Sequence, residues 1–208
     1  MFEDILTEEQ QSILEILKRR PFINLFYLAG GTGLALHLGH RRSLDFDFFT
    51  QTEFQASHLL SQIQQVEKVL VAREAKDTLT IDLRGTQTCF FKYDYPLLRP
   101  LLTFKQTLKI ADIPDIAAMK LSAVSGRGSK KDFIDLFFVC KRFPLKELLG
   151  FLRKKYETIS YSEYHILKSL IYFDDAEEEP MPEMIHHINW PEVKAFFIRE
   201  VKYLFDIK

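Results

Sequence analysis

Two aspartates one residue apart, in the segment Leu44-Asp45-Phe46-Asp47-Phe48, constrain the fold of this chain more than any other feature. Side chains alternate between the two faces of a strand, so the segment predicts a half-buried strand with both carboxylates on one face and the apolar side chains on the other. Like charges side by side on a strand are unfavourable unless a cation lies between them. The pattern therefore predicts a divalent metal site at Asp45 and Asp47.

A glycine-rich turn lies just before this strand, at Gly30-Gly31-Thr32. Glycine lets backbone amides approach a phosphate closely, and the threonine hydroxyl supplies a further donor. A short helix is expected over residues 34–38, and the N-terminus of a helix favours an anion. The turn and the carboxylates together predict a nucleoside triphosphate site, in which the metal ion bridges to the phosphates. The alternative is a glycine turn that precedes two exposed acids and binds nothing.

The composition sets limits on the partners. The 208 residues carry 28 Lys and Arg against 29 Asp and Glu, a net charge of -1, so the chain has no overall basic surface for nucleic acid. No stretch is long and apolar enough to span a bilayer, and the acidic N-terminus lacks the features of a secretion signal. We therefore expect a cytoplasmic protein without membrane contact, in which any RNA contact is local. The basic residues available for such a contact are Arg41, Arg42, Arg127, Lys130 and Lys131.

Hydrophobic periodicity predicts an α+β fold, with a mixed sheet followed by a helical part. The capping box Thr7-Glu8-Glu9-Gln10 begins a first helix. A second long helix is expected over 53–66, and strands are expected over 24–29, 44–49, 69–73, 79–83 and 88–93. A loop follows, and the spacing then becomes helical over 113–125, 131–140, 145–156, 162–173 and 191–205, with an acidic solvated loop at 174–180. We expect two parts: a core with its N-terminal helix over 1–112, and a helical region over 113–208 that completes the cleft.

A second group of charged residues lies in the segment from Asp115 to Leu136. Lys120 is expected on a helix that ends at the glycines near Gly126. Asp132 and Asp135 are three residues apart, so they share one face of the next helix. The alternative is an ordinary helical hairpin whose charges are solvated. Beside the first motif, the arrangement favours the opposite wall of a nucleotide cleft.

The two segments resemble a known family. The residues Gly30 to Leu36 and Gly39 to Phe49 are similar to the leading motif of the AbiEii/AbiGii toxin-type nucleotidyltransferases. Asp115 to Leu136 resembles the second signature of that family, a lysine helix leading to an arginine and a Lys-Asp-Phe-x-Asp-Leu run. With the Tyr93-Asp94-Tyr95-Pro96-Leu97-Leu98 segment between the two motifs, the resemblance covers roughly residues 24 to 140.

The resemblance implies a polymerase-beta-like nucleotidyltransferase core, with a helical C-terminal part that closes over the nucleotide. Asp45 and Asp47 would then bind Mg²⁺ or Mn²⁺, and Lys120 would neutralise phosphate charge. Asp132 would act as a base or as an orienting acid near the acceptor. The residues expected around the NTP are Gly30, Gly31, Thr32, Arg41, Arg42, Ser43, Lys120, Arg127, Lys131 and Asp135.

The implied activity is the transfer of a nucleoside monophosphate from an NTP to an RNA, with tRNA among the candidates, or to a protein. The family further implies the toxin of a bacterial toxin–antitoxin or phage-defence system, with a cognate antitoxin as partner.

The sequence differs from the usual polymerase-beta-like pattern in one respect, and this leaves an alternative function open. Polymerase-beta-like enzymes usually add a third carboxylate from a neighbouring strand, but the run Cys89-Phe90-Phe91-Lys92 contains no acid, and Asp82 and Asp94 are weak candidates. A noncatalytic nucleotide-binding protein with a regulatory or interaction role, built on the same fold, is therefore the second hypothesis.

Overall fold

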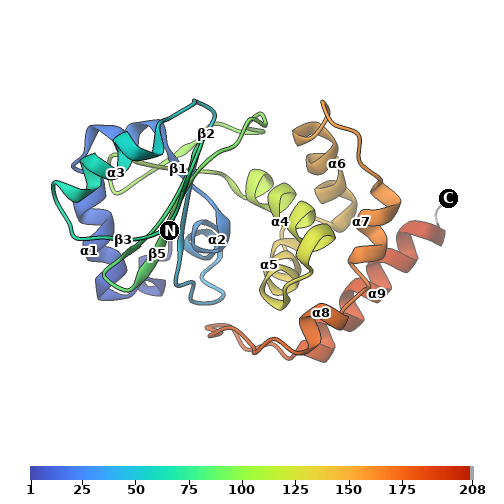
Figure 1. Cartoon of the computed structure of the whole chain (residues 1–208). Coiled ribbons are helices and arrows are strands. Elements are labelled where there is room, and N and C mark those ends of the chain that lie inside the picture. Colours follow the sequence, from blue (N-terminus) through green and yellow to red (C-terminus); the bar gives the residue numbers. More distant parts are fainter. Residues whose placement is uncertain (207–208) are drawn as a thin grey trace.

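The computed structural model describes residues 1–206, and its strands form one mixed seven-stranded sheet in the order β3-β4-β5-β2-β1-β7-β6 (Figure 1). The strands are β1 (Tyr27–Leu28), β2 (Phe46–Thr50), β3 (Leu70–Ala75), β4 (Thr78–Leu83), β5 (Thr86–Lys92), β6 (Leu102–Phe104) and β7 (Leu108–Ile110). Strand β2 runs parallel to β5 and antiparallel to β1. The sheet therefore places the Asp45–Asp47 segment near its centre.

The helices divide between the two halves of the molecule (Figure 1). Beside the sheet lie α1 (Glu8–Leu17), α2 (Gly30–Leu38) and α3 (Ala56–Gln64), with the 3-10 helices η1 (Glu3–Ile5) and η2 (Pro21–Leu25). The other half consists of α4 (Ile113–Arg127), α5 (Lys130–Cys140), α6 (Leu145–Lys155), α7 (Glu163–Ser169), α8 (Asp174–Glu177) and α9 (Trp190–Asp206). None of these described helices is long and apolar enough to cross a membrane.

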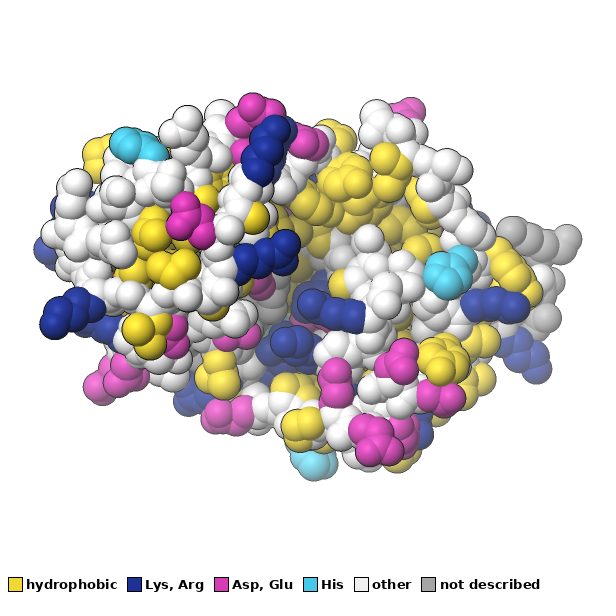
Figure 2. Space-filling model, viewed as in Figure 1, with side chains coloured by type: hydrophobic (Ala, Val, Ile, Leu, Met, Phe, Trp, Pro, Cys, Tyr) yellow, Lys and Arg dark blue, Asp and Glu magenta, His cyan; other side chains and the backbone are white. Residues whose placement is uncertain are grey.

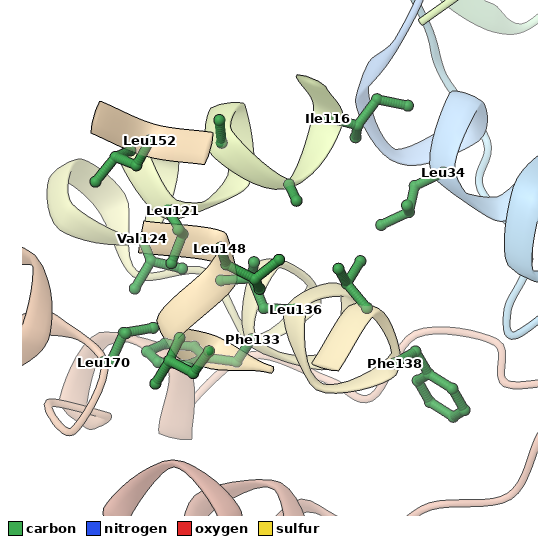
Figure 3. Packing of buried hydrophobic residues seen from close by; sticks show 14 of the residues in the cluster. Leu34, Ile116, Leu121, Val124, Phe133, Leu136, Phe138, Leu148, Leu152 and Leu170 are labelled. Atoms are coloured by element: carbon green, nitrogen blue, oxygen red, sulfur yellow. The ribbon is translucent and has the colours of Figure 1, made fainter. Parts of the chain in front are cut away.

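Two apolar clusters explain why the sheet has one polar face. Phe46, Phe48 and Phe90 lie fully buried in the cluster that α1 and α3 share with the sheet. The second cluster fills the helical half and reaches across to the sheet half, since it includes both Leu136 of α5 and Leu34 of α2 (Figure 3). Because side chains alternate along β2, the Asp45–Asp47 face points away from the first cluster and toward α4.

The α+β fold expected from the sequence is confirmed, and so is the capping box at Thr7 and Gln10. Several elements are shorter than expected, among them β1, α3 and α7, and three further differences affect the site or the sheet. Helix α2 begins at Gly30, four residues earlier than expected, so the glycines form its first turn. Strands β6 and β7 were not expected, because three-residue strands are too short to show a periodic pattern.

The acidic segment at 174–180 is the third difference, because it is not simply a solvated loop. Residues 174–177 form α8, and the Glu179 carboxylate accepts hydrogen bonds from the Ser129 hydroxyl and the Lys130 backbone amide, each at 2.8 Å. An acid is stabilising at this place, because the first amides of a helix have no partner within the helix. The segment therefore holds the N-terminus of α5.

Truncating the helical core should destabilise the whole fold. Leu136 is fully buried, and Leu136→Ala is expected to lower the free energy of unfolding by about 3 kcal/mol, because it removes apolar contacts and leaves a cavity. The matched control is Ile198→Ala on α9, where the side chain is 53% exposed and the expected change is within about 0.5 kcal/mol. Urea unfolding followed by circular dichroism measures both, and equal values would contradict the assignment of this cluster as the core.

Candidate active site

A cavity of about 530 Å³ lies between the polar face of the sheet and α4. Figure 2 shows it as a hollow between the two halves of the molecule, with Lys and Arg side chains inside. Its walls contain most of the residues that the sequence singled out: Gly30, Gly31, Arg41, Arg42, Ser43, Asp45, Asp47, Lys120, Arg127 and Lys131. The fold therefore brings the two motifs into one site.

The glycines at the start of α2 are required by close contacts. Gly30 has a φ of +60°, and a Cβ atom there would lie 2.1 Å from Oδ2 of Asp47. A Cβ atom on Gly31 would lie 2.8 Å from both Arg41 Nη2 and Ser43 Oγ. Only glycine allows the first turn of α2 to lie against these polar groups. The helix N-terminus, a guanidinium and a hydroxyl thus converge on one point, which is an arrangement that favours an anion.

Thr32, unlike Gly30 and Gly31, does not face the cavity. Its side chain is fully buried, and its hydroxyl donates a hydrogen bond to the backbone carbonyl of Asp45. The side chain therefore fixes the start of β2 against α2, and Thr32 offers no exposed group to a ligand in the cavity.

Asp45 and Asp47 are both partly exposed in the cavity wall. Burial and the neighbouring negative charge of Asp45 raise the pKa of Asp47, although the positive charge of Lys120 opposes them. A cation between the two carboxylates would reduce the electrostatic repulsion between them and favour the ionised form of Asp47. Oxygen ligands of this kind suit Mg²⁺ or Mn²⁺, so the donor set fits a divalent metal ion.

A third acid is missing from the sheet beside these carboxylates. The residue opposite Asp47 on β5 is Cys89. Asp82 accepts a hydrogen bond from the Gly85 amide in the β4–β5 turn, Asp94 pairs with Lys92, and neither Asp82 nor Asp94 lines the cavity. Over residues 1–206, no three His, Cys, Asp or Glu side chains are grouped so as to hold a metal ion.

A buried ion network lies behind the opposite wall. Asp135 is fully buried and accepts two hydrogen bonds from the Arg41 guanidinium, at 2.7 and 2.9 Å. It also lies 2.8 Å from His40 Nε2 and 2.7 Å from Lys120 Nζ. Burial alone would raise the pKa of Asp135, but Arg41 and Lys120 outweigh it and hold the pKa well below its usual range.

Asp132 also pairs with Lys120 and adds Arg127 to the network. It is fully buried, 2.7 Å from Lys120 Nζ and 2.9 Å from Arg127 Nε. Burial opposes ionisation here too, but the charges of Lys120 and Arg127 lower the pKa of Asp132. Asp132 and Asp135 do not line the cavity themselves, whereas Arg41, Lys120 and Arg127 do. The two acids therefore orient cations toward the cavity.

A segment near the C-terminus completes the site, and it was not predicted from the sequence. The backbone of Glu183 accepts a hydrogen bond from the Arg42 amide at 2.8 Å, and the Ile185 amide donates to the His40 carbonyl at 2.9 Å. The Glu183 carboxylate lies 2.8 Å from Arg42 Nε, and Pro182 and Glu183 both line the cavity. No local pattern predicts this contact, because it depends on the packing of the helical half.

Fold and site together define the class of protein. MenT4, a nucleotidyltransferase toxin from Mycobacterium tuberculosis H37Rv, has a similar structure, with a TM-score of 0.57 and 15% identity over 93% of this chain and 84% of its own. A presumed nucleotidyltransferase from H. pylori matches with a TM-score of 0.55 and 18% identity, over 98% of this chain and 99% of its own. At these identities the likeness shows a nucleotidyltransferase fold.

Sequence comparisons add the family. Residues 12–103 match the family model described as "Nucleotidyl transferase AbiEii toxin, Type IV TA system". The chain is 44% identical over 202 residues to the uncharacterized protein aq_aa25 of Aquifex aeolicus (strain VF5), covering 95% of this chain and 96% of that one. Residues 12–103 therefore carry the AbiEii nucleotidyltransferase domain, and the chain is a nucleotidyltransferase.

Removing the central acid of the ion network should destabilise the protein. Asp135→Asn leaves Arg41 and Lys120 buried without their full counter-charge, so a loss of about 3 kcal/mol in the free energy of unfolding is expected. The control Glu163→Gln breaks the exposed pair with Arg153 and should cost less than about 1 kcal/mol. Urea unfolding at neutral pH compares the two, and similar costs would show that the network adds no stability.

The same network predicts how stability depends on pH. The pKa values of Asp132 and Asp135 are lowered by folding, so their stabilisation is complete above the ordinary aspartate value of about 3.9 and is lost as pH falls through the lowered values. The wild type should therefore lose more unfolding free energy than Asp135→Asn between about pH 4 and pH 3. Urea unfolding at several pH values tests this, and parallel curves would refute it.

Proposed function

We propose that this protein transfers a nucleoside monophosphate from an NTP to a hydroxyl group of an RNA or protein acceptor, with Mg²⁺ or Mn²⁺ as cofactor. One observation carries the proposal: the paired carboxylates Asp45 and Asp47, the N-terminus of α2 and the Lys120 ammonium all line the same cavity. Nucleotidyl transfer needs mainly positioning and stabilisation of phosphate charge, and these groups supply both.

In the proposed reaction the cavity residues bind either the phosphates or the metal ion. Gly31 and the first amides of α2 receive phosphate oxygens together with Arg41 and Ser43, and Lys120 neutralises phosphate charge. Asp45 and Asp47 hold the divalent ion, which when bound stabilises the charge that develops on the phosphate and leaving oxygens. Arg127 and Lys131 are exposed in the cavity wall and add positive charge at its entrance.

The reaction follows from this placement. An acceptor hydroxyl oxygen forms a bond to the α-phosphorus, and the bond from that phosphorus to the oxygen bridging the α- and β-phosphates breaks. Pyrophosphate leaves, and the hydroxyl proton passes to water. Asp132 is fully buried and bonded to two cations, so we assign it the role of positioning Lys120 and Arg127 rather than that of a base.

The division of the chain is part of the proposal. Residues 1–112 would act as the catalytic core, and residues 113–208 would form the helical region that completes the cleft. The family match supports a role as the toxin of a bacterial toxin–antitoxin system, acting on a cytoplasmic acceptor and inhibited by a cognate antitoxin. The alternative, nucleotide binding without transfer, is favoured by one feature: Cys89 stands where a third acid would lie.

Removing one metal-binding carboxylate should abolish transfer without unfolding the protein. Asp47→Asn is expected to lower the transfer rate by at least roughly a hundredfold, because charge stabilisation at the phosphate is lost. The metal-free variant should be as stable as the wild type or slightly more so, because a like-charge contact disappears. The control is Asp94→Asn, which changes an exposed aspartate outside the cavity.

The assay incubates each labelled NTP with magnesium, total RNA and cell lysate, and separates the products on a gel. Label on a discrete RNA or protein band with the wild type and Asp94→Asn, but not with Asp47→Asn, would support the proposal and identify the acceptor class. No label with any acceptor, together with magnesium-dependent thermal stabilisation by an NTP, would establish the noncatalytic alternative.

A further inference from the structure

Two phenylalanines extend the polar face of the sheet beyond the carboxylates. Phe49 follows Asp47 on the same face of β2, and Phe91 follows Cys89 on the same face of β5. The strand register places the two side by side, with ring centroids 5.6 Å apart and an angle of 36° between the ring planes. Both are half-buried and line the cavity.

This aromatic pair lies outside the cluster under α1 and α3, although Phe49 also packs on Tyr27 at the edge of the second cluster. Phe46, Phe48 and Phe90 alternate with Phe49 and Phe91 along the same strands and fill the cluster under α1 and α3. Phe49 and Phe91 point the other way, into a cavity whose remaining walls carry many charged groups. Large apolar side chains that stay partly exposed in such a cavity suggest an apolar part of a ligand.

The aromatic surface continues past the cavity. Tyr93 contacts Phe49 edge to face at 5.5 Å, and Tyr95 contacts Tyr93 in the same way at 4.8 Å. Figure 2 shows apolar side chains along one wall of the hollow, next to the basic side chains in its centre. The surface is therefore longer than one ring pair, and it ends against the buried Tyr156 at the end of α6.

The order of residues gives the cavity two different ends. Ser43 precedes the carboxylates along the chain and lies with Arg41 at the anion-binding end, whereas Phe49 follows them at the aromatic end. In an in-line displacement the attacking oxygen and the leaving pyrophosphate lie on opposite sides of the phosphorus. Pyrophosphate at the Ser43 end therefore places the attacking acceptor at the Phe49 end.

We propose that Phe49 and Phe91 form the acceptor platform of this enzyme, on which the unpaired terminal base of an RNA stacks while its ribose hydroxyl faces the α-phosphorus. The inference rests on the proposed function and adds the residues that select the acceptor. Aromatic side chains bind unpaired bases of any sequence through stacking, whereas a base within a duplex has no free face. The bonds made and broken are those of the transfer described above.

The test replaces the rings while keeping their apolar volume. The double variant Phe49→Leu with Phe91→Leu is compared with the wild type and with Phe143→Leu, a half-buried aromatic that packs on Phe151 outside the cavity. The probes are a fluorescent single-stranded oligoribonucleotide, the same oligoribonucleotide with its terminus paired in a blunt duplex, and each NTP with magnesium. Anisotropy measures RNA binding, thermal unfolding measures NTP binding, and label transfer measures KM for the single-stranded probe.

The double variant should bind the single-stranded probe roughly fivefold or more weakly and raise its KM similarly, because base stacking is lost. Binding of the duplex and stabilisation by NTP should remain at the wild-type level, and Phe143→Leu should leave all readouts unchanged. Unchanged RNA binding in the double variant would overturn the platform. Loss of NTP stabilisation would also overturn it, because the rings would then hold the base of the NTP.

Two further outcomes separate this inference from the proposed function. Transfer by the wild type to protein alone would overturn the RNA platform but leave nucleotidyl transfer established. Absence of transfer to every acceptor would contradict the proposed function, and with it the platform.

Discussion

The buried carboxylate of Asp135 is the interaction on which the rest of the site depends. Asp135 is a residue of α5, and its carboxylate contacts both the His40–Arg41 segment before β2 and Lys120 on α4. A charge removed from water is costly, and the cost is offset only when counter-charges and hydrogen bonds surround it completely. Asp135 meets this condition with three cationic or polar partners. The two halves of the molecule are therefore fixed to one another at the site itself.

Charge balance around the cavity constrains what it can bind. The cations are Arg41, Arg42, Lys120, Arg127 and Lys131, and the carboxylates that face or support them are Asp45, Asp47, Asp132, Asp135 and Glu183. The site is thus close to neutral before any ligand enters. A triphosphate brings several negative charges, and most of these cations already share their charge with carboxylates, so the nucleotide alone would leave the site with excess negative charge. A divalent ion entering with the nucleotide removes this difficulty.

Local sequence patterns, with the family resemblance, predicted the parts of the site and its two opposite walls, but not the contacts that hold the walls together. The alternation around Asp45 and Asp47, the glycines of α2 and the helix with Lys120 can each be recognised from a few neighbouring residues. The contact of Glu183 with Arg42 and the burial of Asp132 depend on how distant helices pack, so no pattern in the sequence indicates them. Strands β6 and β7 were not predicted for a different reason. Each has three residues, which are too few to show the alternation of apolar and polar side chains.

The residue opposite Asp47 is Cys89, and it limits the ligands that this chain can offer to the proposed metal ion. Burial raises the pKa of the Cys89 thiol, so this side chain stays neutral. A neutral thiol is a poor ligand for a hard cation, which leaves two carboxylates from the protein. Mg²⁺ prefers six oxygen ligands and is commonly held by one or two carboxylates, waters and substrate phosphates. In the proposed reaction the phosphates of the NTP would supply further oxygen ligands, so that metal and nucleotide would each strengthen the binding of the other.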